Sequence, residues 1–267
     1  MVDATLPPGK EEDELKGTEA PLLDHLIELR KRLIYSLAAV VVFFIGCFII
    51  AKPIYDILVL PFRWAGGTSM IYTAPQEFFF TEMNVALFGA LFLAFPFIAV
   101  QIYSFIAPGL YKRERRAFVP YLVATPVFFL LGALMVYFGV APMALHFFLG
   151  MQQTTPGDIT IQMQTRVSEY LGFIMTLIIA FGICFQLPVI LTLLARIEVV
   201  NSKMLGKGRK YAVVAILGIA ALLSPPDPLS QIGLSLPMYG LYELSILAVK
   251  WVEKQRAQKL AAEAVKA

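Results

Sequence analysis

The residue types that most often carry chemistry in proteins are few in this chain. Its two cysteines, Cys47 and Cys184, lie far apart inside apolar segments, and its two histidines, His25 and His146, are also widely separated. Neither pair has the spacing of a zinc site, and buried apolar thiols are ordinary packing groups. We therefore expect no metal and no cofactor.

Two charged stretches each place one acid among several bases. They are HLIELRKRL, residues 25–33, and PGLYKRERR, residues 108–116, and their acids are Glu28 and Glu114. Because Glu28 and Arg32 are four residues apart, the simplest interpretation of the pattern alone is an ion pair on a helix surface.

Two further polar residues lie within long apolar segments. Glu243 is the one carboxylate well inside such a segment, and Gln186 is an amide between Phe185 and Leu187. A polar group in lipid is costly, so each is a candidate functional residue. A single carboxylate is nevertheless a poor basis for an ion pump, which needs several titratable groups.

The segments that hold these residues indicate an integral membrane protein. Apolar residues make up 58% of the 267 residues and charged residues only 15%, against about 25% charged in soluble domains. A soluble protein of this size could not bury so much apolar surface. Six apolar runs predict six transmembrane helices: Leu33–Ala51, Met83–Tyr103, Ala117–Val140, Leu171–Ala195, Tyr211–Ser224 and Ile232–Val249.

Helices five and six are predicted to be short. Residues 211–224 give a helix of roughly 21 Å at 1.5 Å per residue, less than the ~30 Å hydrocarbon layer. We expect either local thinning of the bilayer there or shielding by other helices.

The basic residues predict the orientation of the six helices. Lysines and arginines total 22, and all of them lie outside the predicted spans. Nineteen fall on the side that holds both termini and the second and fourth loops. Positive charge stays in the cytoplasm, so this bias predicts that both ends of the chain are cytoplasmic.

The terminal segments are predicted to be cytoplasmic tails. Residues 1–20 are acidic and contain two prolines, which favours disorder and excludes a signal peptide or a transit peptide. We divide the chain into this disordered tail, a six-helix membrane domain over residues 21–250, and a second tail over residues 251–267. The expected location is the cytoplasmic (inner) membrane of a bacterium.

Four sequence motifs, in order along the chain, resemble one protein family. The chain is similar to the TatC family, the core subunit of the twin-arginine protein translocase, over about residues 20–250. The motifs are HLIELRKRL at 25–33, FIAPGLYKRERR at 105–116, FGICFQLPV at 181–189, and LLSPPDPLSQ at 222–231 followed by PMYGLYE at 237–243.

This resemblance implies a receptor for folded cargo proteins whose signal peptide carries two adjacent arginines. By the family pattern Glu28 and Glu114 bind that arginine pair, and Arg30 and Phe105 are tied to activity. We expect Phe105 to pack and Arg30 to orient the acids. Guanidinium and carboxylate groups pair through two parallel hydrogen bonds, which suits this role. The chain has no nucleotide-binding loop, so the energy for transport must come from elsewhere. The resemblance implies that the source is the proton motive force.

The resemblance also implies outer-side residues, a shape and partners. Pro61, Tyr137, Asp227 and Gln231 match family positions on the outer side. The family fold is a curved bundle with a concave face, which prolines inside the spans would suit because they kink helices. These prolines are Pro96, Pro120, Pro126, Pro188 and Pro237.

The expected partners are single-span subunits similar to TatA and TatB, in an oligomeric complex within membrane lipid. Their helices would dock on the polar residues Gln186, Glu243 and Gln231. Many family members carry Glu where this chain has Gln186, and Gln keeps the hydrogen bonding but cannot titrate. We therefore expect Gln186 to form a hydrogen bond with a polar residue of a partner helix and not to carry protons. The alternative is a satisfied polar group between helices of this chain.

Two other functions compete with the receptor. A secondary transporter of a small solute or ion would need a midplane site with several polar groups and broken helices. An intramembrane enzyme would need a nucleophile and a base, yet the chain has no G-x-S-x-G motif and no histidine within a predicted span. We therefore expect no enzyme activity, and we expect no nucleic-acid partner.

Overall fold

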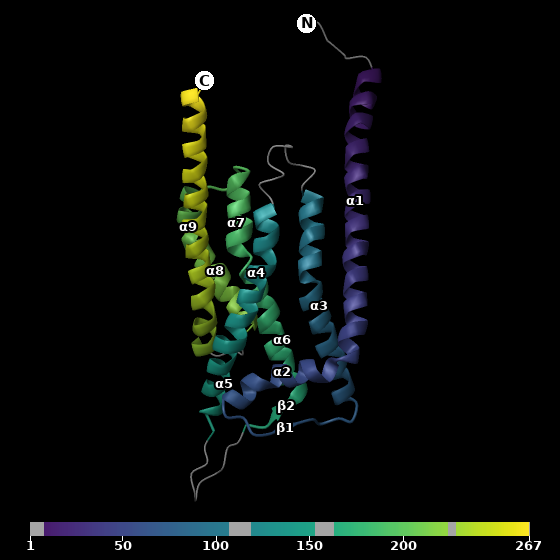
Figure 1. Cartoon of the computed structure of the whole chain (residues 1–267), viewed down its shortest axis with the longest axis vertical. Helices are drawn as coiled ribbons and strands as arrows, with labels where there is room; N and C mark the ends of the chain where they lie inside the picture. Colours follow the sequence, from purple (N-terminus) through teal and green to yellow (C-terminus); the bar gives the residue numbers. More distant parts are fainter. Residues whose placement is uncertain (1–7, 107–118, 153–162, 224–227, 267) are drawn as a thin grey trace, which may run out of the picture.

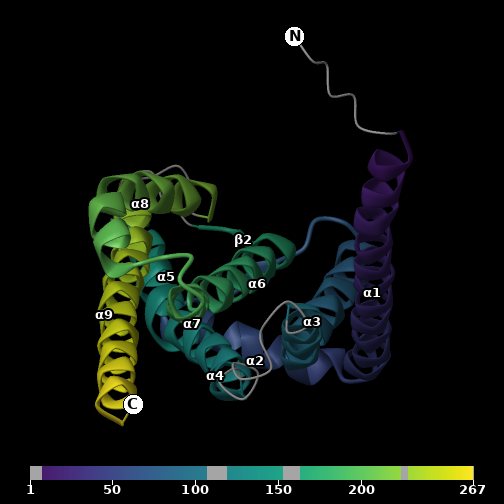
Figure 2. The ribbon, with the colours of Figure 1, turned by 90° about the horizontal axis from the view of Figure 1, so that it is seen from above.

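The computed structural model describes residues 8–106, 119–152, 163–223 and 228–266. Within these residues the fold is helical apart from two strands of two residues each. The long helices run side by side, and α2 (Ala51–Trp64) lies across one end of the bundle (Figure 1). Seen along the bundle, α1 lies at one side and α8 and α9 lie at the other (Figure 2).

Within the described residues, five helical segments are long and apolar enough to cross a membrane. The predicted all-α membrane fold is confirmed at this level. Residues 211–223 of the predicted fifth span lie within α8, which is not among the five. The five segments are His25–Ile49, Glu77–Phe105, Pro120–Leu149, Val167–Arg196 and Gln231–Gln258.

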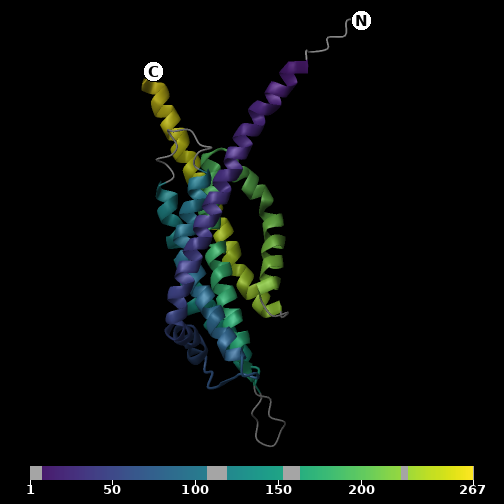
Figure 3. The same ribbon diagram turned by 90° about the vertical axis from the view of Figure 1, so that its right-hand side faces the viewer.

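Two helices, α1 (Pro8–Ile49) and α9 (Pro228–Lys266), are much longer than a membrane is thick. At 1.5 Å per residue, their 42 and 39 residues span about 63 and 58 Å, twice the hydrocarbon thickness. Both project from the same end of the molecule (Figure 3). α1 includes residues 8–20, the acidic segment for which composition predicts disorder; the division at residues 20 and 250 stays a prediction.

Helix α2 closes the opposite end of the bundle. Leu58, Val59 and Phe62 are buried on one of its faces, while Lys52 and Arg63 are exposed. A helix with one apolar and one polar face lies at a boundary between core and water or headgroups.

The third predicted span, residues 117–140, corresponds to two helices within the described residues, and a third helix continues it without a loop. α4 (Val119–Met135) leads into η3 (Val136–Val140), a π-helical turn, and then into α5 (Ala141–Leu149). Residues 120–149 therefore form one apolar column.

Helix α6 (Val167–Cys184) occupies the centre of the core. Leu171, Ile174, Leu177 and Phe181 are each fully buried. Their spacing by three and four residues places them along one side of the helix. They pack with buried residues of α2, α3, α4 and α9.

Helices α4 and α6 approach closely through two glycines. A Cβ on Gly132 would lie 2.7 Å from the carbonyl oxygen of Phe181, and a Cβ on Gly182 would lie 2.5 Å from the ring of Phe129. Small residues allow membrane helices to pack backbone against backbone. At these two positions any residue larger than glycine would clash with the facing helix.

The fourth predicted span is broken in the structure. α6 ends at Cys184, and α7 (Leu187–Arg196) begins after a two-residue turn at Phe185 and Gln186. Pro188 stands at the start of α7, where its missing N–H costs little.

The carboxyl-terminal part of the bundle is the hairpin of α8 (Ser202–Leu223) and α9. The Glu253 carboxylate caps the start of α8, accepting hydrogen bonds from the Ser202 N–H at 2.8 Å and from the Ser202 hydroxyl at 2.6 Å. The Tyr242 hydroxyl donates to the Leu205 carbonyl at 2.8 Å.

The strands β1 (Met70–Ile71) and β2 (Thr165–Arg166) form a small parallel pair. They join the segment after α2 to the segment before α6, at the same end of the bundle as α2 (Figure 1).

Candidate functional site

The first motif forms a polar cluster between α1 and α3 (Glu77–Ile106). The Arg32 guanidinium donates to the Glu28 carboxylate at 3.1 Å and to the side-chain oxygen of Gln101 at 3.2 Å. The two charged side chains are about one-third exposed, and Gln101 is buried. The Glu28 carboxylate in this cluster therefore already binds one guanidinium and is still accessible to water.

The four predicted residues of this site have different outcomes. Phe105 stacks on the His25 ring, with centroids 4.2 Å apart, so it packs as expected. Arg30 is exposed, and the residue that orients Glu28 is Arg32 instead. Glu114 lies outside the described residues, so its approach to Glu28 stays a prediction.

Gln101 and Arg32 are the two members of this cluster that sequence reasoning did not assign to the site. The spacing of Arg32 from Glu28 indicated their ion pair. Gln101 comes from 69 residues away, and its only signal is an amide near the end of an apolar run.

Gln186 serves the helix break between α6 and α7. Its backbone N–H bonds to the Ile183 carbonyl, and its side-chain amide donates to the Gly182 carbonyl at 3.3 Å and to the Thr125 carbonyl of α4 at 3.0 Å. The amide thus satisfies a carbonyl left over at the break and ties α7 to α4. The structure agrees with the alternative of a satisfied polar group between helices.

Glu243 of α9 is paired with a base from α8. Its carboxylate accepts from Arg209 at two atoms, each 2.8 Å away, and from the Tyr239 hydroxyl at 2.8 Å. Two parallel bonds fix the geometry of the pair. The carboxylate is about one-third exposed, so a partner can still reach it.

Two of the predicted outer-side residues, Pro61 and Tyr137, lie within or contact α2. Pro61 is fully buried inside α2, and the Tyr137 hydroxyl donates to the Ile57 carbonyl at 2.7 Å. Gln231 donates to the Leu217 carbonyl of α8 at 3.1 Å. Asp227 lies outside the described residues.

A second polar cluster, at the end of the bundle that α2 closes, was not foreseen. The Glu77 carboxylate accepts from the Thr73 N–H at 2.8 Å and from the Ser168 hydroxyl at 2.5 Å. Arg166 donates to the Thr73 hydroxyl and pairs with Glu169 at 3.2 Å. These contacts connect the starts of α3 and α6, and they depend on loop geometry that local sequence does not specify.

Within the described part of the chain, no group of three or more His, Cys, Asp or Glu side chains is placed to hold a metal ion.

Comparisons with known proteins agree with this architecture. The family described as Sec-independent protein translocase protein (TatC) matches residues 24–237. The chain is 44% identical to the Sec-independent protein translocase protein TatC of Magnetococcus marinus, over 92% of this chain and 89% of the relative. It is 39% identical to the protein of the same name in Escherichia coli K12, over 85% and 86% of the two chains.

The fold comparison gives the same result. A crystal structure described as the twin-arginine translocase receptor TatC superposes with a TM-score of 0.76 and 35% identity, covering 86% of this chain and 99% of that chain. A family match over most of the chain, relatives of similar length and a shared fold lead to one conclusion: this chain belongs to the TatC family of Sec-independent protein translocases.

Proposed function

We propose that this chain is the signal-peptide receptor of a twin-arginine translocase and reads the arginine pair of its cargo with Glu28 and Glu114. Its family is one of protein translocases and not of enzymes, and the chain is a multi-pass protein of the bacterial inner membrane. This family membership replaces the small-solute transporter as an interpretation of the apolar helices.

One observation carries the proposal: Glu28 is already a guanidinium ligand. The Arg32 side chain bonds to it at 3.1 Å, while the carboxylate keeps about one-third of its surface exposed. A carboxylate has about four acceptor positions, so it can take a second guanidinium or exchange the first. Glu28 therefore has the chemistry and the access that an arginine receptor needs.

The test is photocrosslinking of membranes containing this protein to a signal peptide with its Arg-Arg pair and to the same peptide with Lys-Lys. We expect the Arg-Arg peptide to crosslink more strongly, because lysine cannot form the two parallel bonds. Equal crosslinking of both peptides to the folded protein would refute the receptor role and leave only the shared fold.

We further propose six transmembrane helices with both ends of the chain in the cytoplasm. The charge bias of the loops supports this orientation, and so does the projection of α1 and α9 from the same end (Figure 3). α8 then supplies the fifth span, with its basic start in the cytoplasm.

Labelling of single cysteines tests this topology. Thr68 and Lys203 are both exposed, and they lie at opposite ends of the bundle in the proposed orientation. In Thr68→Cys and Lys203→Cys the new thiols should react with impermeant reagents from opposite sides of the membrane. Reaction of both thiols from one side would contradict the proposed orientation. The exposed Lys254 follows the membrane part of α9, so Lys254→Cys should react from the same side as Lys203→Cys. Reaction of Lys254→Cys from the opposite side would contradict six spans.

We propose that single-span subunits similar to TatA and TatB dock beside α8 and α9. Val214 and Leu222 of α8 and Leu236 of α9 are exposed apolar residues of the same hairpin as the half-exposed pair of Glu243 and Arg209. Two other residues that were predicted to dock these subunits are less suited to it. The Gln186 amide is buried and bonded within the chain, and Gln231 lies at the other end of the hairpin from Glu243.

Glu243→Gln should reduce co-purification with these subunits several-fold while leaving crosslinking to the Arg-Arg peptide nearly unchanged. The substitution keeps an acceptor for Tyr239 but removes the charge that Arg209 pairs with. Equal losses of subunit and peptide binding would count against separate sites.

A further inference from the structure

A groove of about 560 Å³ opens between α4, α7 and α9, and none of the roles above uses it. It lies where α4 begins and α7 ends, at the end of the bundle from which α9 projects (Figure 1). In the proposed orientation this end faces the cytoplasm.

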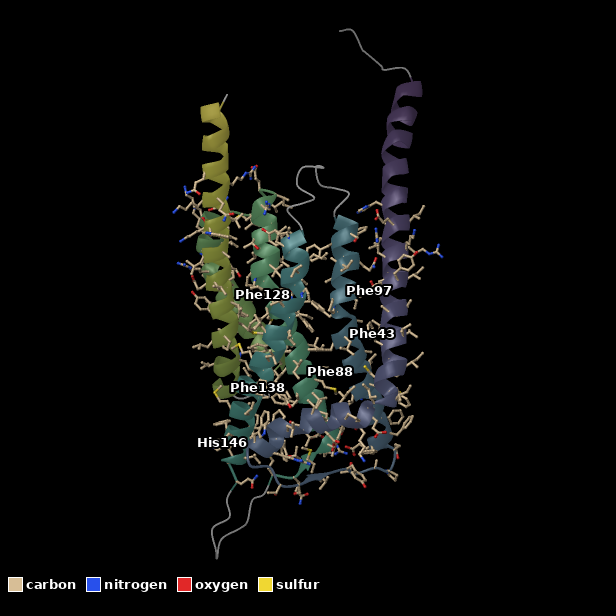
Figure 4. The ribbon with its side chains drawn as sticks, in the orientation of Figure 1. Phe43, Phe88, Phe97, Phe128, Phe138 and His146 are labelled. Atoms are coloured by element: carbon tan, nitrogen blue, oxygen red, sulfur yellow. The ribbon has the colours of Figure 1, made fainter. Side chains whose placement is uncertain are left out.

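The walls of the groove are apolar. Phe128 of α4 (labelled in Figure 4), Val189 of α7 and Val252 of α9 contribute side chains from three separate helices. A volume of this size between membrane helices suits a flexible hydrocarbon chain.

The rim of the groove is basic. Arg196, in the last turn of α7, and Arg256 of α9 both line it. Among the described residues, no carboxylate pairs with Arg196, whereas Arg256 pairs with the well-exposed Glu198. Trp251, which is 63% exposed, stands beside them, and tryptophan favours the depth of lipid headgroups.

Glu198 has an unusual backbone for its residue type. It adopts φ 65° directly after α7, with the Val199 N–H bonded to Leu194 and its own N–H bonded to Ala195. This is the glycine position of a common helix ending. A glutamate is unfavourable in this left-handed backbone conformation, yet its carboxylate forms the ion pair with Arg256.

We propose that this groove is a binding site for an anionic phospholipid. The phosphate lies between Arg196 and Arg256, an acyl chain enters the apolar groove, and Trp251 contacts the glycerol region. Basic pockets between membrane helices on the cytoplasmic side recognise anionic headgroups by this chemistry. Glu198 competes with the phosphate for Arg256 and moderates the affinity.

The chain itself provides the probe, because it contains only two tryptophans. In a Trp64→Phe background, Trp251 is the sole indole. The full-length protein is reconstituted in phosphatidylcholine vesicles that contain a minor fraction of either brominated phosphatidylglycerol or brominated phosphatidylcholine. Bromine quenches an adjacent indole, so the ratio of the two quenching constants measures headgroup preference at the groove.

We expect about a fivefold or greater preference for the anionic lipid, the ratio that one cation near an anionic headgroup provides. Arg196→Gln should reduce the ratio to near one, and Arg196→Lys should retain most of it. Glu198→Gln should raise the ratio by freeing Arg256. Lys254→Gln is the matched control, because Lys254 is an exposed base of α9 that does not line the groove.

Three results would overturn the proposal. Equal quenching by both lipids in the parent protein would mean that the groove takes lipid without reading its headgroup. Absence of quenching by either lipid would mean that protein covers the groove. A loss of preference in Lys254→Gln as large as in Arg196→Gln would assign the effect to general surface charge. None of these results bears on binding of the Arg-Arg peptide.

Discussion

Glu28→Gln should weaken binding of an Arg-Arg signal peptide by about tenfold or more. A hydrogen bond to a charged group contributes about 1.5–3 kcal/mol, and 1.4 kcal/mol corresponds to a factor of ten. The amide keeps the size of the side chain and one acceptor for Arg32, so the variant should still insert and fold. The measurement is crosslinking of the Arg-Arg peptide as a function of its concentration.

Glu169→Gln is the control for this experiment. Glu169 also pairs with an arginine on its own chain, three residues earlier, but it lies at the opposite end of the bundle. Its substitution should leave peptide binding unchanged. If Glu28→Gln lowered thermal stability while the preference for Arg-Arg over Lys-Lys survived, Glu28 would be only a structural partner of Arg32. We expect Glu114→Gln to behave like Glu28→Gln.

Gly132→Ala should destabilise the bundle strongly, although it adds only one methyl group. The added Cβ would lie 2.7 Å from the Phe181 carbonyl oxygen and 3.0 Å from the Gly182 Cα. Both are backbone atoms, so α4 and α6 must separate. Overpacking of this kind typically costs about 1–3 kcal/mol, and the central position of α6 means that the whole core must adjust. The measurement is the unfolding temperature of the purified protein in detergent.

Gly172→Ala is the matched control because Gly172 lies in α6 and a Cβ there meets no atom within 4 Å. This variant should be neutral or slightly more stable, since alanine favours a helix by up to about 1 kcal/mol over glycine. Similar unfolding temperatures for both variants would show that the close contact of α4 and α6 does not determine stability.

The existence of the helices could be predicted from the sequence because lipid imposes a simple requirement. A run such as residues 83–103 is too apolar for water and long enough to span, so it must be helical. Each of the six predicted runs falls mainly within helical structure.

The details that the sequence did not reveal depend on contacts between distant segments. The break at Phe185 and Gln186 interrupts a run that is apolar throughout, and it is stabilised by a carbonyl of α4. The link between Arg32 and Gln101 and the pairing of β1 with β2 likewise join segments far apart in the chain. Hydrophobic periodicity carries no information about such partners.

The roles of Glu28 and Glu243 show the same limit for the candidate site. Sequence reasoning identified both acids, since carboxylates near or within apolar segments are rare. It did not identify Arg209 as the partner of Glu243, because a base at the start of one helix and an acid within the next meet only after the hairpin of α8 and α9 forms.

The π-helical turn at Val136–Val140 has a consequence for the history of this segment. A π turn holds one residue more than the α turn it replaces, as a single-residue insertion into an α-helix would give. A chain lacking Val136 would keep the column from α4 to α5 as an unbroken α-helix, but Tyr137 would rotate about the axis of α4 and its bond to Ile57 would be lost. Natural gain or loss of single residues in this column should therefore concentrate at this turn, and should be accompanied by a change at the tyrosine.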